Sequence, residues 1–309
     1  PYTRPAQQAT PPSVPEDSIP PPIMDKHYLT PLFSPQSVLV FAGNPEDAAA
    51  AFAQAKALYA NLTAQRFNGE IRFVDIQTTG TLADLALARA DLAIIALPHA
   101  EVAAALEVAG RMKCKAALVI SAGMGADLAA DLKRIARRSG MHLLGPNCLG
   151  MQRPYIGLNA SVAGTLAAKG PLGLVSQSGA LTSSILDWAH SNGVGFSAVV
   201  SLGPNTVVDL ADVLDFLAAD AQTQSIVVYM EGIGNARRFM SALRAAANAK
   251  PVVVLKAGRK PAGNAAAQTH SGTIVGSDDV FAAALRRAGA VRVRSFVELF
   301  SAAKCLASR

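Results

Sequence analysis

One histidine, His270, lies in a segment dominated by alanine, glycine, serine and threonine, AAAQTHSGTIVGSDD (265–279). An unperturbed imidazole titrates near pH ~6.5, so a useful fraction of it is neutral and nucleophilic near neutral pH. Glycines at 263, 272 and 276 give the backbone around this histidine conformational freedom. Composition alone is more typical of an incidental surface histidine, so a chemical role for His270 needs a further signal.

A second candidate is a strand-to-helix junction in the stretch LVSQSGALTSSILDWA (174–189), where Ser176, Gln177, Ser178 and Gly179 occupy the turn. The first backbone N–H groups of a helix lack intrahelical partners and form the positive end of the helix dipole. Small residues let a phosphate or carboxylate approach these groups closely. The alternative is a plain serine N-cap without a ligand, and the spacing leaves both interpretations open.

A third candidate is Glu231, in the stretch YMEGIGN (229–235), which follows an expected buried strand and begins a glycine-rich turn. Ligands of open α/β sheets gather at the carboxyl edge of the strands. A carboxylate there can accept a hydrogen bond from a histidine and fix its tautomer. Without a named partner, an exposed loop acid is the simpler interpretation.

The elements that must position these groups alternate between short aliphatic runs and alanine-rich helical segments, which predicts parallel sheets wrapped by helices. The chain of 309 residues is long enough for two such domains. Residues 147–171 break the alternation with Gly, Pro and Asn, and we interpret them as a crossover between domains. We expect strands at 38–41, 71–76, 92–97, 117–120 and 142–144, and then at 174–175, 197–202, 226–230, 252–255 and 291–293.

The composition restricts the kind of protein. Residues 1–22 hold eight prolines among polar residues and are expected to form a disordered or extended lead-in. The net charge of +6 is spread as arginine pairs on expected helices, without interleaved aromatic residues, which does not favour a nucleic-acid partner. Three cysteines without metal-ligand spacing indicate neither a disulfide framework nor a metal site, and no signal peptide or membrane span is apparent. A cytoplasmic location is therefore expected.

Six motifs occur in one order: LLGPNCLG, SQSGA, SLG, YMEGIGNARRF, KPVVVLKAGR and THSGTIVGSD. Together they resemble the NDP-forming acyl-CoA synthetases, which include the ADP-forming acetate–CoA ligases and the α subunit of succinyl-CoA synthetase. The resemblance covers nearly all of residues 30–309 and is strongest to bacterial members fused to ATP-grasp and GNAT acetyltransferase domains. It implies a lead-in at 1–30, a Rossmann-like CoA-binding domain at 31–160, and a flavodoxin-like, succinyl-CoA synthetase-like doubly wound domain at 161–309.

The chemistry that this resemblance implies is a phosphoryl relay. In that family, acyl-CoA and phosphate give an acyl phosphate and free CoA, and a histidine then carries the phosphoryl group to ADP in an ATP-grasp partner. His270 matches that histidine, and Glu231 matches the acid that orients it. The phosphate site corresponds to Ser178 and Gly179, with Ser271 and Gly272 in the histidine loop. ADP or ATP, with Mg²⁺, is expected only through the partner.

The resemblance places the CoA pocket at the first domain. In the family a glycine-rich first strand–helix turn holds the CoA phosphates, and a GPNC segment lines the same pocket. We assign Gly43, Pro98, Asn147 and Cys148 to this pocket. The segment FAGNPEDAAAAF (41–52) keeps only Gly43 of the glycine-rich turn.

Alternative functions remain open at this point. The same two domains could serve as a regulatory acyl-CoA sensor of a GNAT-type lysine acetyltransferase that has lost ligase chemistry, or as a structural or dimerising unit. A nicotinamide site, suggested by Asp75 after the second strand, lacks a G-x-G-x-x-G motif. Cys148 as a nucleophile has no base nearby in sequence, and a small core or pocket residue is the better interpretation. Homo-oligomers are compatible with every alternative.

The altered first turn generates a prediction. Asn44 is the expected N-cap of the following helix, and Glu46 and Asp47 in its first turn satisfy that helix's own N–H groups and repel a phosphate. We therefore expect residues 30–309 to bind CoA more weakly than relatives with an open glycine loop. Isothermal titration with CoA and acetyl-CoA measures this, and tight binding would contradict it.

Overall fold

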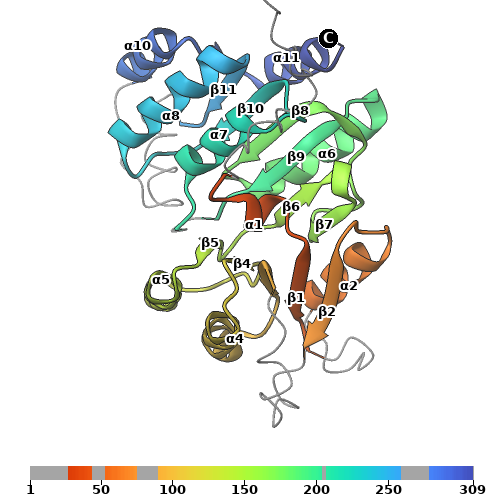
Figure 1. The fold of residues 1–309 in the computed structure, drawn as a ribbon. Coiled ribbons are helices and arrows are strands. Elements are labelled where there is room, and N and C mark those ends of the chain that lie inside the picture. The colour runs from red at the N-terminus through yellow and green to blue at the C-terminus, as the bar shows by residue number, and fades with distance from the viewer. Residues whose placement is uncertain (1–26, 44–52, 75–89, 204–206, 259–277, 309) are drawn as a thin grey trace, which may run out of the picture.

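The computed structural model describes residues 27–43, 53–74, 90–203, 207–258 and 278–308. These residues form two sheets, each with helices on both faces (Figure 1). Most of the expected lead-in lies outside the described residues. Its last residues, however, are part of the fold, because Leu29 is fully buried and helix α1 (Thr30–Phe33) begins directly after it.

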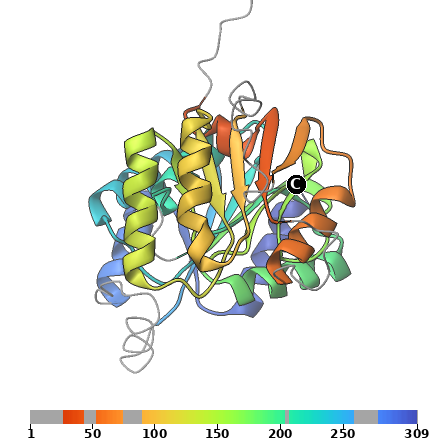
Figure 2. The same cartoon turned by 90° about the horizontal axis from the view of Figure 1, so that it is seen from below.

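The first sheet has five parallel strands in the order β2-β1-β3-β4-β5. Helices α4 (His99–Arg111) and α5 (Ala126–Ser139) pack side by side on one face, as Figure 2 shows, and α1 and α2 (Ala53–Thr63) contribute buried residues to the core of the other face. The strands are β1 (Ser37–Phe41), β2 (Glu70–Val74), β3 (Leu92–Ile95), β4 (Ala116–Val119) and β5 (His142–Leu144).

The second sheet has seven strands in the order β12-β11-β10-β8-β9-β6-β7. Helices α6 (Gly179–Asn192) and α11 (Phe296–Ala307) cover one face, where Trp188 stacks on Phe300. Helices α7 (Leu210–Ala219), α8 (Ala236–Ala249) and α10 (Asp278–Ala288) cover the other. The parallel strands are β8 (Lys169–Ser176), β9 (Phe196–Ser201), β10 (Ser225–Met230), β11 (Val252–Lys256) and β12 (Val291–Val293).

All ten expected strands are present. The expected crossover at 147–171 contains the antiparallel strands β6 (Gly150–Arg153) and β7 (Leu158–Ser161), and β6 pairs with β9. Every residue of both strands is buried, including the polar residues Gln152, Arg153, Asn159 and Ser161. Both strands are only four residues long and are flanked by Gly, Pro and Asn, which favours a loop interpretation. The expected domain boundary after residue 160 falls inside β7, and the two sheets instead divide at the segment between β5 and β6.

The two sheets share one hydrophobic core. Residues of α1, such as Leu32 and Phe33, belong to the same buried cluster as Leu214 and Phe216 of α7. The Phe33 and Phe216 rings lie 4.5 Å apart. Among the described helices, none is both long and apolar enough to cross a membrane.

A buried ion pair fixes the C-terminal end of α7. Arg153 donates through Nη1 and Nη2 to Asp220 at 2.8 and 3.2 Å, and the two side chains are only 4% and 9% exposed. Burial alone would raise the pKa of Asp220, but the hydrogen bonds and charge of Arg153, helped by Thr223, hold that pKa below its usual value.

We expect Arg153→Met to lower the free energy of unfolding by about 3–5 kcal/mol, because it leaves a buried carboxylate unpaired. In the wild type, the stability linked to Asp220 is present above the unfolded pKa of an aspartate and is lost as the pH falls through the lower folded pKa. Urea denaturation between acidic and neutral pH measures both effects, and the variant should show the weaker acid dependence. Arg134→Met, at an exposed pair with Asp131, is the control and should change stability by less than about 1 kcal/mol.

Candidate functional site

The strand-to-helix junction of the second sheet places a helix start at the carboxyl edge. Ser178 is the N-cap of α6 and accepts a hydrogen bond from Leu181 N at 3.4 Å. Ser176 Oγ accepts from Ser178 N at 3.1 Å and donates to Ser178 O at 2.9 Å, which holds the turn. Within the described part of the chain, no acceptor meets the backbone N–H groups of Gly179 and Ala180. The serine cap is therefore present and still leaves donors for an anion.

Glu231 lies at the same edge, directly after β10, and Gln177 fixes its backbone. Gln177 Oε1 accepts from Glu231 N at 2.7 Å and from Gly232 N at 3.1 Å, and Gln177 Nε2 donates to Gly232 O at 3.0 Å. Burial raises the pKa of Tyr229, and the neighbouring Glu231 charge raises it further. The sequence places Gln177 in the turn and indicates no role for it. The signal available was its position between the two serines that shape the helix start.

The GPNC segment lies against this junction. A Cβ on Gly179 would lie 3.0 Å from Leu149 Cγ, and a Cβ on Gly203 would lie 1.9 Å from Pro146 O. Leu149 N also donates to Ser201 Oγ at 3.2 Å. Leu149, the residue after the GPNC segment, therefore touches the helix start assigned to phosphate, and Pro146 touches Gly203 after β9. The two glycines are needed for these close approaches.

Asn147 and Cys148 within that segment have structural contacts. Asn147 adopts a φ of 58°, accepts from Met124 N and donates to Met124 O, both at 3.0 Å. The Cys148 thiol is buried and donates to Val119 O at 3.5 Å. Burial raises the pKa of Cys148 to about 12, so the thiol is protonated at neutral pH and unsuited to nucleophilic attack. The core-residue interpretation of Cys148 fits this position, and a part in CoA binding would fall to its backbone.

Gly43 and Pro98 lie at the first sheet's point of strand-order reversal. Gly43 follows β1, Pro98 precedes α4 after β3, and these two strands are neighbours. The strand order β2-β1-β3 means that the chain leaves β1 toward one side of the sheet and leaves β3 toward the other. Doubly wound sheets bind ligands at the point between two such strands. Gly43 has a φ of 70°, and its Cβ position meets no described atom within 4 Å. Pro98 is exposed.

Several predicted residues lie outside the described residues: His270, Ser271, Gly272, Asp75, and the first turn of the expected helix at 44–47. The described end of the strand before the histidine segment holds one further residue that the sequence did not indicate, Lys256. Lys256, the last residue of β11, is 4% exposed and donates to Ala257 O at 3.1 Å. Burial lowers its pKa. Among the described residues, no three His, Cys, Asp or Glu side chains gather into a metal site.

Comparison with known families defines the class. Residues 68–154 match a CoA binding domain, and residues 169–306 match a succinyl-CoA ligase-like flavodoxin domain. These two domains, in this order and with the site geometry described above, place the chain in the NDP-forming acyl-CoA synthetase superfamily.

Individual relatives narrow the resemblance to ADP-forming ligases. The chain is 43% identical over 222 residues to acetate–CoA ligase [ADP-forming] I of Archaeoglobus fulgidus, covering 70% of this chain and 32% of that protein. It is 38% identical over 225 residues to the α subunit of acetate–CoA ligase [ADP-forming] I of Pyrococcus furiosus, covering 71% and 48% respectively. The chain thus spans about a third to a half of these relatives.

A solved structure supports the same assignment. The dinucleotide-forming acetyl-coenzyme A synthetase 1 of Ca. Korarchaeum cryptofilum, in complex with phosphate and ADP, superposes with a TM-score of 0.82 at 28% identity. The match covers 90% of this chain and 62% of that chain. The similarity therefore extends across both sheets.

The three hydrogen bonds between Gln177 and the Glu231 turn can be tested without a ligand. We expect Gln177→Ala to accelerate amide hydrogen exchange at Glu231 and Gly232 by roughly 2- to 10-fold each, since each hydrogen bond contributes about 0.5–1.5 kcal/mol. Asn147→Gly is the matched control, because glycine tolerates the positive φ and the change removes only the bonds to Met124. It should accelerate exchange at Met124 alone. Unchanged exchange at Glu231 in Gln177→Ala would show that other contacts hold this turn.

Proposed function

We propose that this chain is the CoA-binding and phosphohistidine part of an ADP-forming acyl-CoA synthetase, an acid–thiol ligase. The observation behind the proposal is the joined arrangement of the Gly179 helix start, the Gln177 side chain and the Glu231 turn at one sheet edge. The relatives named as ADP-forming acetate–CoA ligases support it, as does the related synthetase complexed with phosphate and ADP.

The proposed reaction has two transfers. Phosphate attacks the acyl carbon of acyl-CoA, so that the thioester bond breaks and CoA leaves as the thiol with the formation of an acyl phosphate. His270 then takes the phosphoryl group and releases the carboxylate, and passes the group to ADP to form ATP. The unpaired N–H groups at Gly179 and Ala180 would stabilise the phosphoryl oxygens. Glu231 would orient the imidazole and favour its charged, phosphorylated form.

In this proposal, the chain and an ATP-grasp partner bind different ligands. ADP and Mg²⁺ would be bound by an ATP-grasp subunit or domain, because the chain corresponds to the α subunit in the Pyrococcus furiosus relative. CoA would lie near Gly43 and Pro98, with its thiol end toward the segment at 145–149 that touches α6. The relatives include acetate and 4-hydroxybutyrate ligases, so acyl-CoA thioesters of both acids are the first substrates to test.

The regulatory alternative, a sensor module of a GNAT-type acetyltransferase, makes a different prediction. In a sensor, acyl-CoA binding persists and phosphoryl transfer is absent. No contact among the described residues favours it, and the phosphorylation experiment separates the two functions. A GNAT fusion and homo-oligomer formation stay predictions from the sequence.

We expect the wild-type chain, mixed with an ATP-grasp partner from a related ligase and γ-labelled ATP, to acquire an acid-labile label. The label should be absent in His270→Ala, because no other side chain is proposed to carry the phosphoryl group. Glu231→Gln should slow labelling by roughly 10- to 100-fold without unfolding the domain, since it removes the carboxylate's charge and keeps its shape. Gel autoradiography after acid and base treatment measures the label.

The control is an established α subunit of the same family, labelled under identical conditions with the same partner. If that subunit is labelled and this chain is not, while this chain still binds acetyl-CoA, the sensor function is favoured and the ligase proposal is wrong.

A further inference from the structure

The turn that carries Glu231 is held at both of its ends. At the strand end, Gln177 makes the three bonds to Glu231 and Gly232. At the helix end, Asn235 caps α8 by accepting from Arg238 N at 3.0 Å. Between them, a Cβ on Gly234 would meet no described atom within 4 Å. The position of the turn therefore depends on what fixes the first turn of α8.

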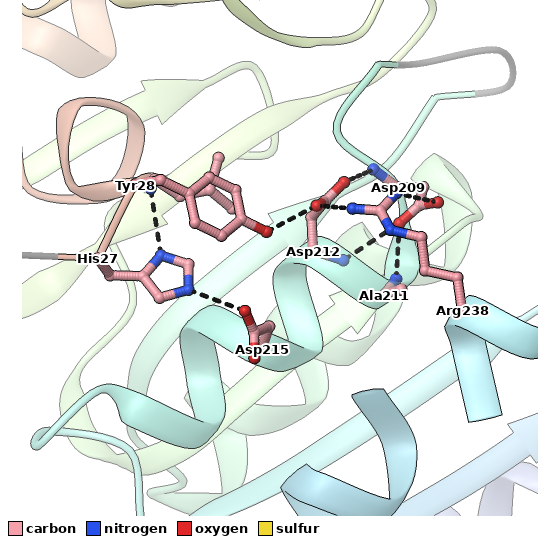
Figure 3. A network of polar contacts seen from close by, with 8 residues as sticks. His27, Tyr28, Asp209, Ala211, Asp212, Asp215 and Arg238 are labelled. Atoms are coloured by element: carbon pink, nitrogen blue, oxygen red, sulfur yellow. Dashed lines mark hydrogen bonds and ion pairs between the residues drawn. The ribbon is translucent and has the colours of Figure 1, made fainter. Parts of the chain in front are cut away.

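Arg238 fixes that first turn against α7. Its Nη1 donates to Asp209 Oδ2 at 2.9 Å and its Nη2 donates to Asp212 Oδ1, as Figure 3 shows. Asp209 and Asp212 form the capping box of α7, and the Asp212 side chain is 7% exposed. The guanidinium thus joins the N-termini of two helices through a carboxylate that packing already holds in place.

The segment before α1 also contacts Asp212. Tyr28 Oη donates to Asp212 Oδ1 at 2.7 Å, next to the arginine (Figure 3). Burial and the bond to Asp212 raise the pKa of Tyr28, so the phenol stays protonated and remains a donor. The Tyr28 ring also lies 5.4 Å from His142 of β5 in the first sheet. The contacts therefore run from the first sheet to the helix that follows the Glu231 turn.

We propose that Arg238 is a positioning residue for Glu231, which acts by clamping the start of α8 to Asp209 and Asp212, with Tyr28 linking this clamp to the first sheet. The proposal rests on the proposed function of Glu231. In this proposal Arg238 contacts neither the substrate nor the phosphoryl group. Its effect passes through the backbone between Glu231 and Asn235.

A purely structural role would make any arginine that pairs with an end of α7 equivalent, and two such arginines allow the comparison. Arg153 pairs with Asp220 at the C-terminal end of this helix and Arg238 pairs with Asp209 and Asp212 at the N-terminal end. Arg153 is the more deeply buried of the two, with a side chain 4% exposed against 48% for Arg238. Loss of Arg153 should therefore cost at least as much stability, at the far end of the helix from the Glu231 turn.

The test compares phosphorylation rates of Arg238→Met and Arg153→Met, each at a temperature where both variants are folded by circular dichroism. We expect Arg238→Met to slow labelling by an ATP-grasp partner roughly tenfold, since small displacements of orienting groups have effects of this size. Arg153→Met should label at the wild-type rate. Arg238→Lys, which keeps the charge and loses the planar fork, should fall between them.

A double-mutant cycle with Glu231→Gln decides whether Arg238 acts through Glu231. In the Glu231→Gln background, Arg238→Met should add little further loss, because the group that it positions is already gone. Equal loss in both backgrounds, or equal slowing by Arg153→Met, would overturn the proposal.

Hydrogen exchange separates this inference from the proposed function. Arg238→Met should accelerate amide exchange at Gly232, Ile233 and Gly234, and Arg153→Met should leave these amides unchanged. If the wild type is never labelled but this exchange pattern holds, the ligase function fails and the clamp stands. If exchange in the turn is the same in both variants, the clamp is wrong whatever the function.

Discussion

Parallel pairing of β8 with β10 and β9 determines where Gln177, the start of α6 and Glu231 lie. Ser176 is in register with Tyr229 on one side and with Ser201 on the other. The three strands therefore end at one level, and the residues that follow them meet at one edge. This pairing brings Gln177 within hydrogen-bonding distance of Glu231. It also brings Leu149 into contact with both Ser201 and α6.

The shared core makes the two sheets one functional unit. Leu32 and Phe33 of α1 belong to the same buried cluster as Phe216 of α7, and the Phe33 and Phe216 rings lie 4.5 Å apart. In the proposed function, a CoA thiol near the first sheet and a phosphate at the second can react only if the segment between β5 and β6 touches the start of α6. The close approach at Gly179 and Gly203, where a side chain would collide, provides that contact.

Polar side chains then refine the position of the site. Gln177 holds one end of the Glu231 turn, and Asn235 with Arg238 holds the other. Orientation is worth several kilocalories in group transfer because it replaces entropy that the reactants would otherwise lose. Residues that do not touch the substrate can therefore change the rate of group transfer. The charged network around Asp212 is the clearest such group in the described part of the chain.

The sequence by itself determined the local features. Apolar runs predicted all ten parallel strands, the SQSG turn predicted a serine cap at a helix start, and ordered motifs indicated the family. It missed the β6–β7 hairpin, because each strand has only four residues and lies among Gly, Pro and Asn, which are typical of loops. Only the tertiary structure decided that Cys148 faces the core, that Gln177 clamps Glu231 and that Arg238 joins two helix starts. These contacts join residues 26 to 54 positions apart, and such pairs depend on strand order and packing, which local periodicity does not encode.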